Sequence, residues 1–213
     1  GDWYYEYSSS MQYCTTNDEI GDYMFHKCAN LQNIVLPKNI TSIGTKAFYG
    51  CSSLISLTIP DSVTKIATSA FAACTSLTSI YIPESVTSIG ETAFYKCSTM
   101  SSIVIPNSVT SIGRAAFQDC SSLISIDIPD SVKKMEHETF FRCTSLTSVT
   151  IGDGLTSIPS EAFLECSSLT SVKIGDGVTS IGHYAFEFCS SLSSLTIGKS
   201  VKSIGYYVFS GCI

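Results

Sequence analysis

A cysteine recurs at an exact interval of 23 residues along almost the whole of this chain. The cysteines stand at positions 28, 51, 74, 97, 120, 143, 166, 189 and 212, and each has a phenylalanine three residues before it. An exact period in this range is typical of repeat architectures, in which each unit must stack on its neighbours to bury its apolar edge. The period therefore predicts one elongated domain, although a chain of 213 residues could otherwise form two.

Within each unit the apolar residues keep fixed offsets from the cysteine. After Cys97 they are Met100 at +3, Ile103 and Ile105 at +6 and +8, and Val109 and Ile112 at +12 and +15. The alternation over 103–105 and its β-branched residues predict a strand, and 109–112 predicts a second, shorter extended piece. The spacing in Ala-Phe-x-x-Cys-x-x-Leu predicts a single helical turn. Each coil is thus expected to run strand, turn, strand, helical turn, with the phenylalanines stacked in an internal column.

Prolines and glycines mark where the first strand of each unit ends. Pro37, Pro60, Pro83, Pro106 and Pro129 occupy this position in five units, and Gly152, Gly175 and Gly198 occupy it in three. A proline has no N–H to donate to a continuing ladder, so it indicates a strand end. A further glycine follows the second extended piece, as in Gly113, where we expect a backbone turn that other residues resist. Ala67, Glu136 and Pro159 fill that slot elsewhere, so a positive φ is not required there.

The ten cysteines do not suggest a disulfide framework, in spite of their number. Stacked coils lie roughly 5 Å apart, but stacked side chains point in parallel and not toward one another. We interpret the nine periodic cysteines as small buried apolar residues with free thiols. Cys14 lies outside the register, and it could be free or bridged to Cys28.

Two segments are expected. Residues 1–19 do not fit the repeat and are predicted to form an N-terminal cap, in which Trp3 and Tyr5 cover the open apolar end of the stack; an aromatic ligand-binding patch is the rival interpretation. Residues 20–213 form the repeat array, a half repeat followed by eight full periods. The chain stops one residue after Cys212, without a polar cap, which suggests that the natural protein continues.

Charge and motif content exclude several functions. A net charge of −6 and a pI near 4.9 argue against a nucleic-acid or anionic-membrane partner, which would need a basic face. The sequence has no run of about 18 apolar residues, so we expect no segment to insert into a bilayer. His26, His137 and His183 fall in different slots of different coils, so they are not expected to share a metal. Neither a Gly-x-Ser-x-Gly elbow nor a phosphate-binding glycine motif is present. We expect no cofactor and no catalysis. Asp130, Asp153 and Asp176 could stack on one edge as calcium ligands, but one carboxylate per coil supplies fewer oxygens than calcium requires.

The outward position at offset +7 is the most varied slot of the repeat. It holds Val35, Thr58, Tyr81, Val104, Asp127, Thr150, Lys173 and Thr196. Exposed apolar and aromatic groups on a rigid surface usually mark an interaction site. The predicted binding face consists of Tyr81, Val104, Asp127 and Lys173, with Ile55 and Ile124 at offset +4; a sheet that is merely solvated is the alternative.

A second set of residues follows the repeat phenylalanine closely: Tyr49, Tyr95, Phe141, Leu164 and Phe188. These side chains either shield the phenylalanine column or form a second contact surface, and the sequence leaves both possibilities open.

The pattern Leu-x-x-Ile-x-Ile at +3, +6 and +8 resembles the core of leucine-rich repeats. The full unit, Ile-Pro-x-Ser-Val-Thr-Ser-Ile-Gly-x-x-Ala-Phe-x-x-Cys-x-x-Leu-x-x-Ile, resembles the BspA-type class of that family over residues 20–213. It departs from inhibitor-type repeats because no asparagine ladder follows the strand, and 23 residues leave little room for a long convex helix. The resemblance implies a secreted or surface-anchored microbial protein, associated with virulence, that adheres to host proteins or other cells through its concave sheet.

The predicted fold is therefore a right-handed leucine-rich-repeat solenoid of α/β type, with a parallel concave β-sheet and with short extended segments and single helical turns elsewhere. The predicted function is non-enzymatic protein recognition or adhesion at a cell surface, with a protein ligand as partner. The alternatives are a passive structural spacer that projects another domain and a carbohydrate-binding module in which Tyr81 stacks on the sugar.

Overall fold

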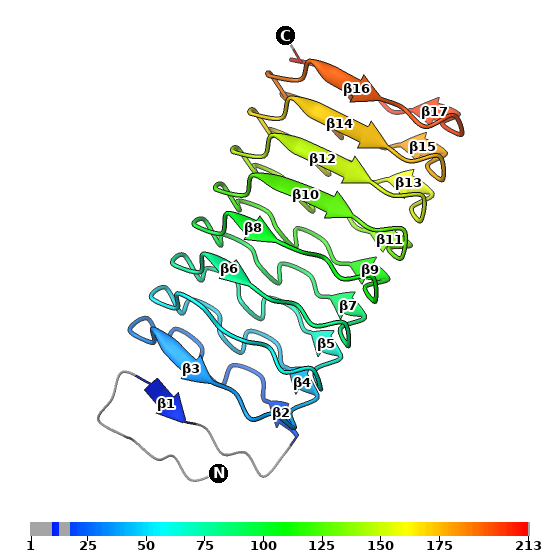
Figure 1. The fold of residues 1–213 in the computed structure, drawn as a ribbon. Coiled ribbons are helices and arrows are strands. Elements are labelled where there is room, and N and C mark those ends of the chain that lie inside the picture. Colours follow the sequence, from blue (N-terminus) through cyan, green and yellow to red (C-terminus); the bar gives the residue numbers. More distant parts are fainter. Residues whose placement is uncertain (1–9, 13–17, 213) are drawn as a thin grey trace.

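The computed structural model describes residues 10–12 and 18–212, which form a stack of similar coils (Figure 1). The chain crosses the near face of Figure 1 from left to right and returns behind it as the coils rise toward the C-terminus, which is the sense of a right-handed coil. Every strand pairs in parallel with its equivalents in neighbouring coils. The stacked solenoid that the period predicts is confirmed.

The first row of strands covers the near face of Figure 1. It consists of β1 (Ser10–Gln12), β3 (Asn33–Val35), β6 (Ser79–Ile80), β8 (Ser102–Ile103), β10 (Ser125–Ile128), β12 (Ser148–Ile151), β14 (Ser171–Ile174) and β16 (Ser194–Thr196). Residues pair with those one period away, for example Asp127 with Thr150 and Thr150 with Lys173. Thr58 and Tyr81 form an isolated parallel bridge within the same row. We call the outward surface of this row the strand face.

A second row of two-residue strands runs beside the first, on the right of Figure 1. It consists of β2 (Glu19–Ile20), β4 (Ser42–Ile43), β5 (Lys65–Ile66), β7 (Ser88–Ile89), β9 (Ser111–Ile112), β11 (Lys134–Met135), β13 (Ser157–Ile158), β15 (Ser180–Ile181) and β17 (Ser203–Ile204). These are the predicted second extended pieces. In each coil, the isoleucine or methionine that ends the piece points into the core, except in β17, where Ile204 is exposed.

Proline positions explain where both ladders break. The N–H of Gly152 donates to Ile128 O (2.8 Å) and that of Gly175 to Ile151 O (2.8 Å), and the strands there are four residues long. Pro83 and Pro106 have no N–H to offer at the same place, and β6 and β8 are only two residues long. In the second row, Pro159 stands in the slot where Gly113 donates to Ile89 O, and the sheet divides there between β11 and β13.

The predicted phenylalanine column runs through the whole array. Ring centroids of successive phenylalanines from Phe25 to Phe209 are 5.0–5.8 Å apart, with interplanar angles of 2–10°. All but the last are buried in one continuous core, together with the apolar residues at +3, +6, +8, +12 and +15 of every coil except the last. The column confirms that equivalent side chains stack coil upon coil.

The predicted helical turns are wrong, because the described residues contain no helix. The residues two before and two after each phenylalanine have positive φ, as Ala115 (52°) and Asp119 (58°) do around Phe117. The N–H of Phe117 donates to Thr139 O of the following coil (2.8 Å). The N–H of Cys120 donates to Phe117 O (3.2 Å) and closes a tight turn within the coil. An α-helix would direct every N–H along its own axis, whereas this segment needs some N–H groups to reach the next coil. The α/β class is therefore not confirmed, and the fold is a β-solenoid with tight turns.

The buried cysteines behave as predicted, and each also has a polar contact. Nine described cysteines carry free thiols, and the seven from Cys51 to Cys189 are buried. Each thiol from Cys51 onward lies 3.1–3.3 Å from the phenylalanine carbonyl 26 residues earlier, as Cys120 Sγ does from Phe94 O. The S–H therefore donates to a buried carbonyl between coils, which a plain apolar residue could not do.

Part of the predicted N-terminal cap lies within the described residues. Strand β1 pairs with β3 and so extends the first row by one strand toward the N-terminus. Trp3, Tyr5 and Cys14 lie outside the described residues. Cys28 is exposed and its thiol is free.

The expectation for Gly113 needs correction. Its φ is not positive, since the only described glycines with positive φ are Gly50 and Gly211. A Cβ on Gly113 would lie 2.5 Å from the backbone nitrogen of Glu91 in the preceding coil. The glycine is favoured there because the coils approach closely, and not because the backbone turns.

Candidate functional site: a recognition surface on the strand face

All six residues of the predicted binding face are exposed on the strand face. The exposed fraction is 60% for Tyr81, 77% for Val104, 47% for Ile55 and 54% for Ile124, and Asp127 and Lys173 are exposed as well. Their strand neighbours at +6 and +8 point into the core, as the eBeB burial pattern of β10 shows. The alternation predicted from the sequence thus places the +7 side chains outward.

The structure brings these residues onto one surface but not into one cluster. Tyr81 and Val104 lie in adjacent coils, whereas Thr150 separates Asp127 from Lys173. Two coil spacings place the backbones of Asp127 and Lys173 about 10 Å apart, and the two residues form no ion pair in the described structure. Along the row, apolar side chains occupy the N-terminal half and charged ones the C-terminal half.

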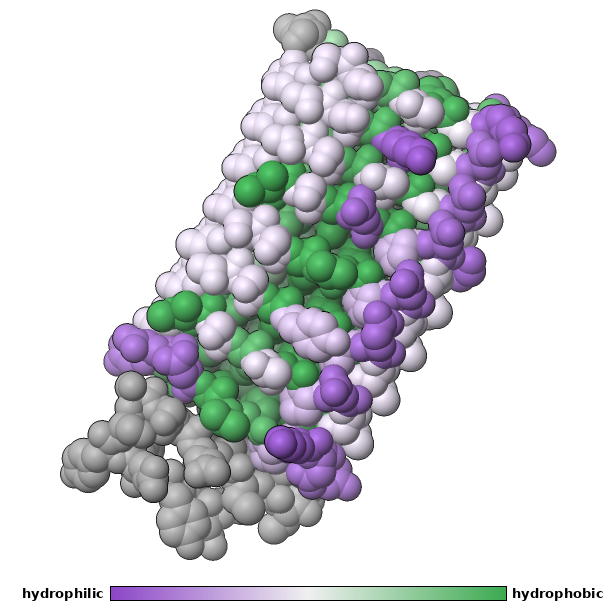
Figure 2. Space-filling model, in the orientation of Figure 1, coloured by the Kyte–Doolittle hydropathy of each residue, from purple (hydrophilic) through white to green (hydrophobic). Residues whose placement is uncertain are grey.

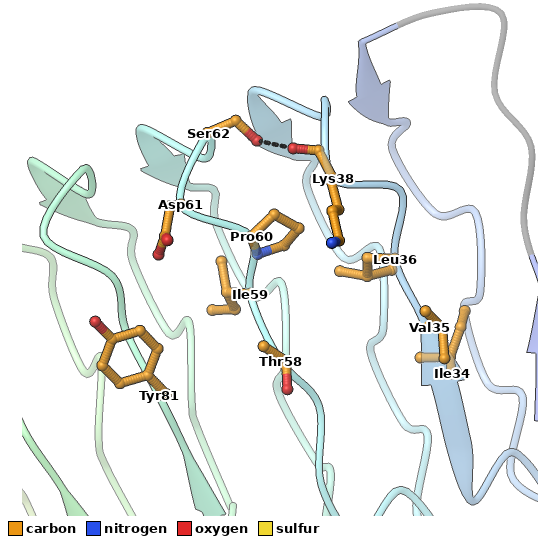
Figure 3. A pocket seen from close by; sticks show the side chains of 10 residues that line it. All are labelled: Ile34, Val35, Leu36, Lys38, Thr58, Ile59, Pro60, Asp61, Ser62 and Tyr81. Atoms are coloured by element: carbon orange, nitrogen blue, oxygen red, sulfur yellow. Dashed lines mark hydrogen bonds between the residues drawn. The ribbon is translucent and has the colours of Figure 1, made fainter.

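A hollow of about 680 Å³ opens on the N-terminal half of the strand face (Figure 3). Its lining residues are Ile34, Val35, Leu36, Lys38, Thr58, Ile59, Pro60, Asp61, Ser62 and Tyr81. Ile34, Leu36 and Ile59 are almost fully buried and contribute apolar surface, while Val35 is 63% exposed. Figure 3 shows the Tyr81 ring on the opposite side of Thr58 from Val35, with Lys38 and Asp61 above.

Sequence reasoning did not identify this hollow or the roles of Val35, Lys38 and Asp61. The hollow lies beside Pro60, between strand β3, which ends at Val35, and the isolated Thr58–Tyr81 bridge. The run of prolines was the available signal, but it marks a strand end without revealing how the side chains around it are arranged.

A row of mostly charged residues borders the strand face at offset +10: Lys38, Asp61, Glu84, Asn107, Asp130, Asp153, Asp176 and Lys199. Figure 2 shows a stripe of hydrophilic residues along this edge and hydrophobic patches across the strand face beside it. We call these eight residues the acidic row, since five of them are acidic.

Three carboxylates of the acidic row link successive coils. Oδ1 of Asp130 accepts the N–H of Asp153 (2.7 Å), and Oδ1 of Asp153 accepts that of Asp176 (2.7 Å). Oδ1 of Asp176 accepts the N–H of Lys199 (3.0 Å), and the Lys199 ammonium lowers the pKa of this carboxyl. A Cβ on Gly175 would lie 2.5 Å from Asp153 Oδ1, so the aspartate ladder needs glycine in the coil that follows. These contacts give the aspartates a structural role, and the described residues contain no group of three or more potential metal ligands.

The second aromatic set lies on the turn side of the coils. Tyr49, Tyr95, Phe141 and Leu164 are half-buried, and Phe188, which follows its phenylalanine by two residues instead of one, is exposed. The Lys96 ammonium lies 5.2 Å from the Tyr95 ring centroid, and the Arg142 guanidinium 4.8 Å from that of Phe141. These half-buried rings with cations over them fit a shielding role better than an open contact surface.

The described residues offer little for nucleophilic or acid–base chemistry. Burial raises the pKa of the Cys51 and Cys189 thiols to about 12 and raises those of the thiols between them as well, which suppresses the reactive thiolate. His183 Nδ1 accepts the N–H of Tyr206 (2.8 Å) and its ring stacks on the Tyr206 ring. In the described part of the chain, no helix is long and apolar enough to cross a membrane.

Comparison with protein families agrees with the geometry of the coils. The family described as the BspA type leucine rich repeat region matches residues 3–105 and 87–213. The chain belongs to this family. A search among curated proteins found no match.

Several bacterial proteins of known structure are similar to this BspA-type repeat protein. The T. pallidum leucine-rich repeat protein TpLRR shares 29% identity with a TM-score of 0.70, over 86% of this chain and 82% of that one. A leucine-rich repeat protein from Bacteroides ovatus shares 27% identity with a TM-score of 0.61. A leucine-rich cell surface protein from Faecalibacterium prausnitzii shares 28% identity with a TM-score of 0.56. These last two matches each cover 92% of this chain and 68% of the other.

Proposed function

We propose that this BspA-type repeat protein is a non-enzymatic recognition module of a secreted or surface-anchored microbial protein, and that its strand face binds a protein ligand. The observation that carries this proposal is the set of large apolar side chains held outward on a rigid sheet. Tyr81, Val104 and Val35 are each at least 60% exposed. Exposed apolar groups of this kind are typical of interaction surfaces.

The rigidity of the support favours binding by contact. Every coil is fixed to its neighbours by backbone hydrogen bonds and by the phenylalanine column, so the strand face is ordered before a ligand arrives. A preordered surface loses little conformational entropy on binding. An extracellular or cell-surface location is supported by the name of the F. prausnitzii protein, and it would suit adhesion.

The test is binding of the purified chain to a panel of secreted and cell-surface protein ectodomains, measured by biolayer interferometry. The double variant Tyr81→Ala/Lys173→Ala should weaken binding at least tenfold while leaving the melting curve unchanged. The matched control Tyr207→Ala/Lys202→Ala removes an exposed tyrosine and an exposed lysine from the last coil and should bind normally.

A passive spacer would give a different result. In that case, no ectodomain would bind with a dependence on Tyr81 and Lys173, and the proposal would be wrong. A glycan array run with the same variants distinguishes the carbohydrate-binding alternative, which predicts loss of glycan binding on Tyr81→Ala.

A further inference from the structure

We infer that the ligand recognised by the strand face is a polypeptide segment that combines apolar and basic side chains, an inference that rests on the function proposed above. Its apolar side chains would cover Val35, Tyr81 and Val104 and enter the hollow that Val35 and Tyr81 line. Its lysine or arginine side chains would lie against Asp61 and Glu84 of the acidic row. Three features of the described residues lead to this partner.

The first feature is that the apolar surface and the acidic row meet in one hollow. Val35 and Tyr81 from offset +7 and Lys38 and Asp61 from offset +10 all line it. A ligand group that fills the hollow therefore touches apolar and charged side chains at once. Its volume of about 680 Å³ falls within the range of ordinary ligand pockets, so a large aliphatic or aromatic side chain fits.

The second feature is a pair of carboxylates, Asp61 and Glu84, which with Lys38 of the preceding coil leave one net negative charge at this edge of the hollow. Asp61 and Glu84 occupy the same slot of adjacent coils, about 5 Å apart at the stacking distance of strands. Neither takes part in the four ion pairs found in the described part of the chain. Because the backbones of these two residues are one coil apart, a single cationic side chain of a ligand can lie near both carboxylates.

The third feature is the chemistry of the exposed apolar groups, which favours a polypeptide over a sugar. Val35, Val104 and Ile55 are aliphatic and suit the side chains of a protein, whereas only Tyr81 offers a ring on which a sugar could stack. Acidic glycans would also be repelled by Asp61 and Glu84. The complementary partner is a protein segment with positive charge.

Lys38 predicts how the bound segment is oriented along the array. It lies at the N-terminal end of the acidic row and lines the hollow next to Asp61, and it forms no ion pair in the described part of the chain. The bound segment should therefore place one carboxylate near Lys38 and its basic residues farther along the array, toward Glu84.

The test uses the full chain and three fluorescein-labelled 12-residue peptides. The first alternates lysine with valine and tyrosine, the second replaces each lysine by glutamate, and the third replaces each apolar residue by serine. Fluorescence anisotropy should show that the first peptide binds at least tenfold more tightly than either of the others. Its affinity should fall when NaCl is raised from 50 to 300 mM, because part of the attraction is between charges.

Protein variants locate the contact. The double variant Asp61→Asn/Glu84→Gln should weaken binding of the basic peptide at least fivefold, and Tyr81→Ala/Val104→Ser should abolish it. The control Glu19→Gln/Glu91→Gln removes two exposed carboxylates that lie outside the strand face and the acidic row and should have no effect.

Three outcomes would overturn the inference: equal or tighter binding of the glutamate peptide, unchanged binding to Asp61→Asn/Glu84→Gln, or no binding of the basic peptide. If an ectodomain binds through Tyr81 while the basic peptide does not, the partner's chemistry is wrong but the proposed function stands. If the basic peptide binds and no ectodomain does, the preference of the strand face for apolar and basic segments stands, but the proposed recognition of a secreted or cell-surface protein is wrong.

Discussion

Raising the pH should unfold this protein through its buried thiols. The seven cysteines from Cys51 to Cys189 are buried in the core, and desolvation raises the pKa of each thiol because the thiolate is penalised there. The pKa is about 12 for Cys51 and Cys189, against a reference value of 9.0. In the unfolded chain the thiols are in water and ionise near that reference value.

Proton linkage gives the direction and the size of the change in the free energy of unfolding with pH. Below pH 9 both states hold their thiol protons, and this contribution to stability is constant. Between about pH 9 and 12 the unfolded chain releases protons that the folded chain retains, so the free energy of unfolding falls as the pH rises. Between pH 8 and pH 10, one such thiol lowers the free energy of unfolding by about 1.4 kcal/mol. Seven thiols acting together would cost roughly 10 kcal/mol, which matches the entire stability of a typical domain.

The assay is urea denaturation followed by far-UV circular dichroism at half-unit steps from pH 7.5 to 10, with a reductant present and oxygen excluded. The urea midpoint should fall steeply above pH 9, and the double variant Cys97→Ala/Cys120→Ala should reduce the slope by about two sevenths. Cys28→Ala removes an exposed thiol and should leave the slope unchanged. A midpoint that is constant from pH 8 to 10, or a slope insensitive to Cys97→Ala/Cys120→Ala, would refute the linkage to buried thiols.

Three further predictions concern packing, the aspartate ladder and the thiols. Phe117→Ala should lower the free energy of unfolding by about 3–5 kcal/mol because it empties the middle of the column, whereas Phe188→Ala at an exposed site should cost less than about 1 kcal/mol; a similar loss for both in urea titration would contradict the column. Asp153→Ala should cost about 1 kcal/mol through the lost hydrogen bond between coils, and Asp61→Ala, which lacks that bond, should cost close to nothing; equal melting temperatures for the two variants would show that the ladder contributes no stability. Alkylation under denaturing, non-reducing conditions should label at least eight of the ten cysteines by mass spectrometry, and labelling of two or fewer would mean that the thiols are paired.

Periodicity made the stack and its core predictable. Once Phe94 and Phe117 are known to occupy equivalent positions, any solenoid places them one above the other, and their rings are stacked 5.4 Å apart. The alternation around Val104 likewise determined which side chains point outward. Both inferences depend only on the repeat and on the two-residue period of a strand.

The turn around each phenylalanine could not be predicted in the same way. Its spacing suits a helix, and its positive-φ positions hold residues such as Lys46, Glu138 and Tyr184, which give no hint of a left-handed backbone. Sixteen described non-glycine residues adopt this conformation, each at some conformational cost. Hydrogen bonds to the next coil offset that cost, and they exist only after the coils have stacked. A local pattern therefore cannot reveal the turn.

The candidate site was predicted in outline and missed in detail. The outward row was found, but the hollow depends on how Lys38, Pro60 and Tyr81 from three coils surround a common space. The sequence analysis considers Asp130, Asp153 and Asp176 only as calcium ligands, and the pattern does not reveal the two roles of the acidic row. Asp130 and Asp153 bond to the backbone of the following coil, whereas Asp61 lines the hollow.

Proline and glycine divide the array into two parts with different physical properties. In the C-terminal part, glycine supplies an N–H to the strand ladder and leaves room for the aspartate ladder, so the coils are joined twice at this edge. In the N-terminal part, proline removes both links, the strands are shorter, and the acidic side chains at Asp61 and Glu84 form no ion pairs in the described structure. The hollow and the exposed Val35, Tyr81 and Val104 also lie in this part. Acidic side chains without ion pairs in the described structure and an interrupted strand ladder thus lie on the same surface. This combination favours the N-terminal half of the strand face as the place where a ligand binds.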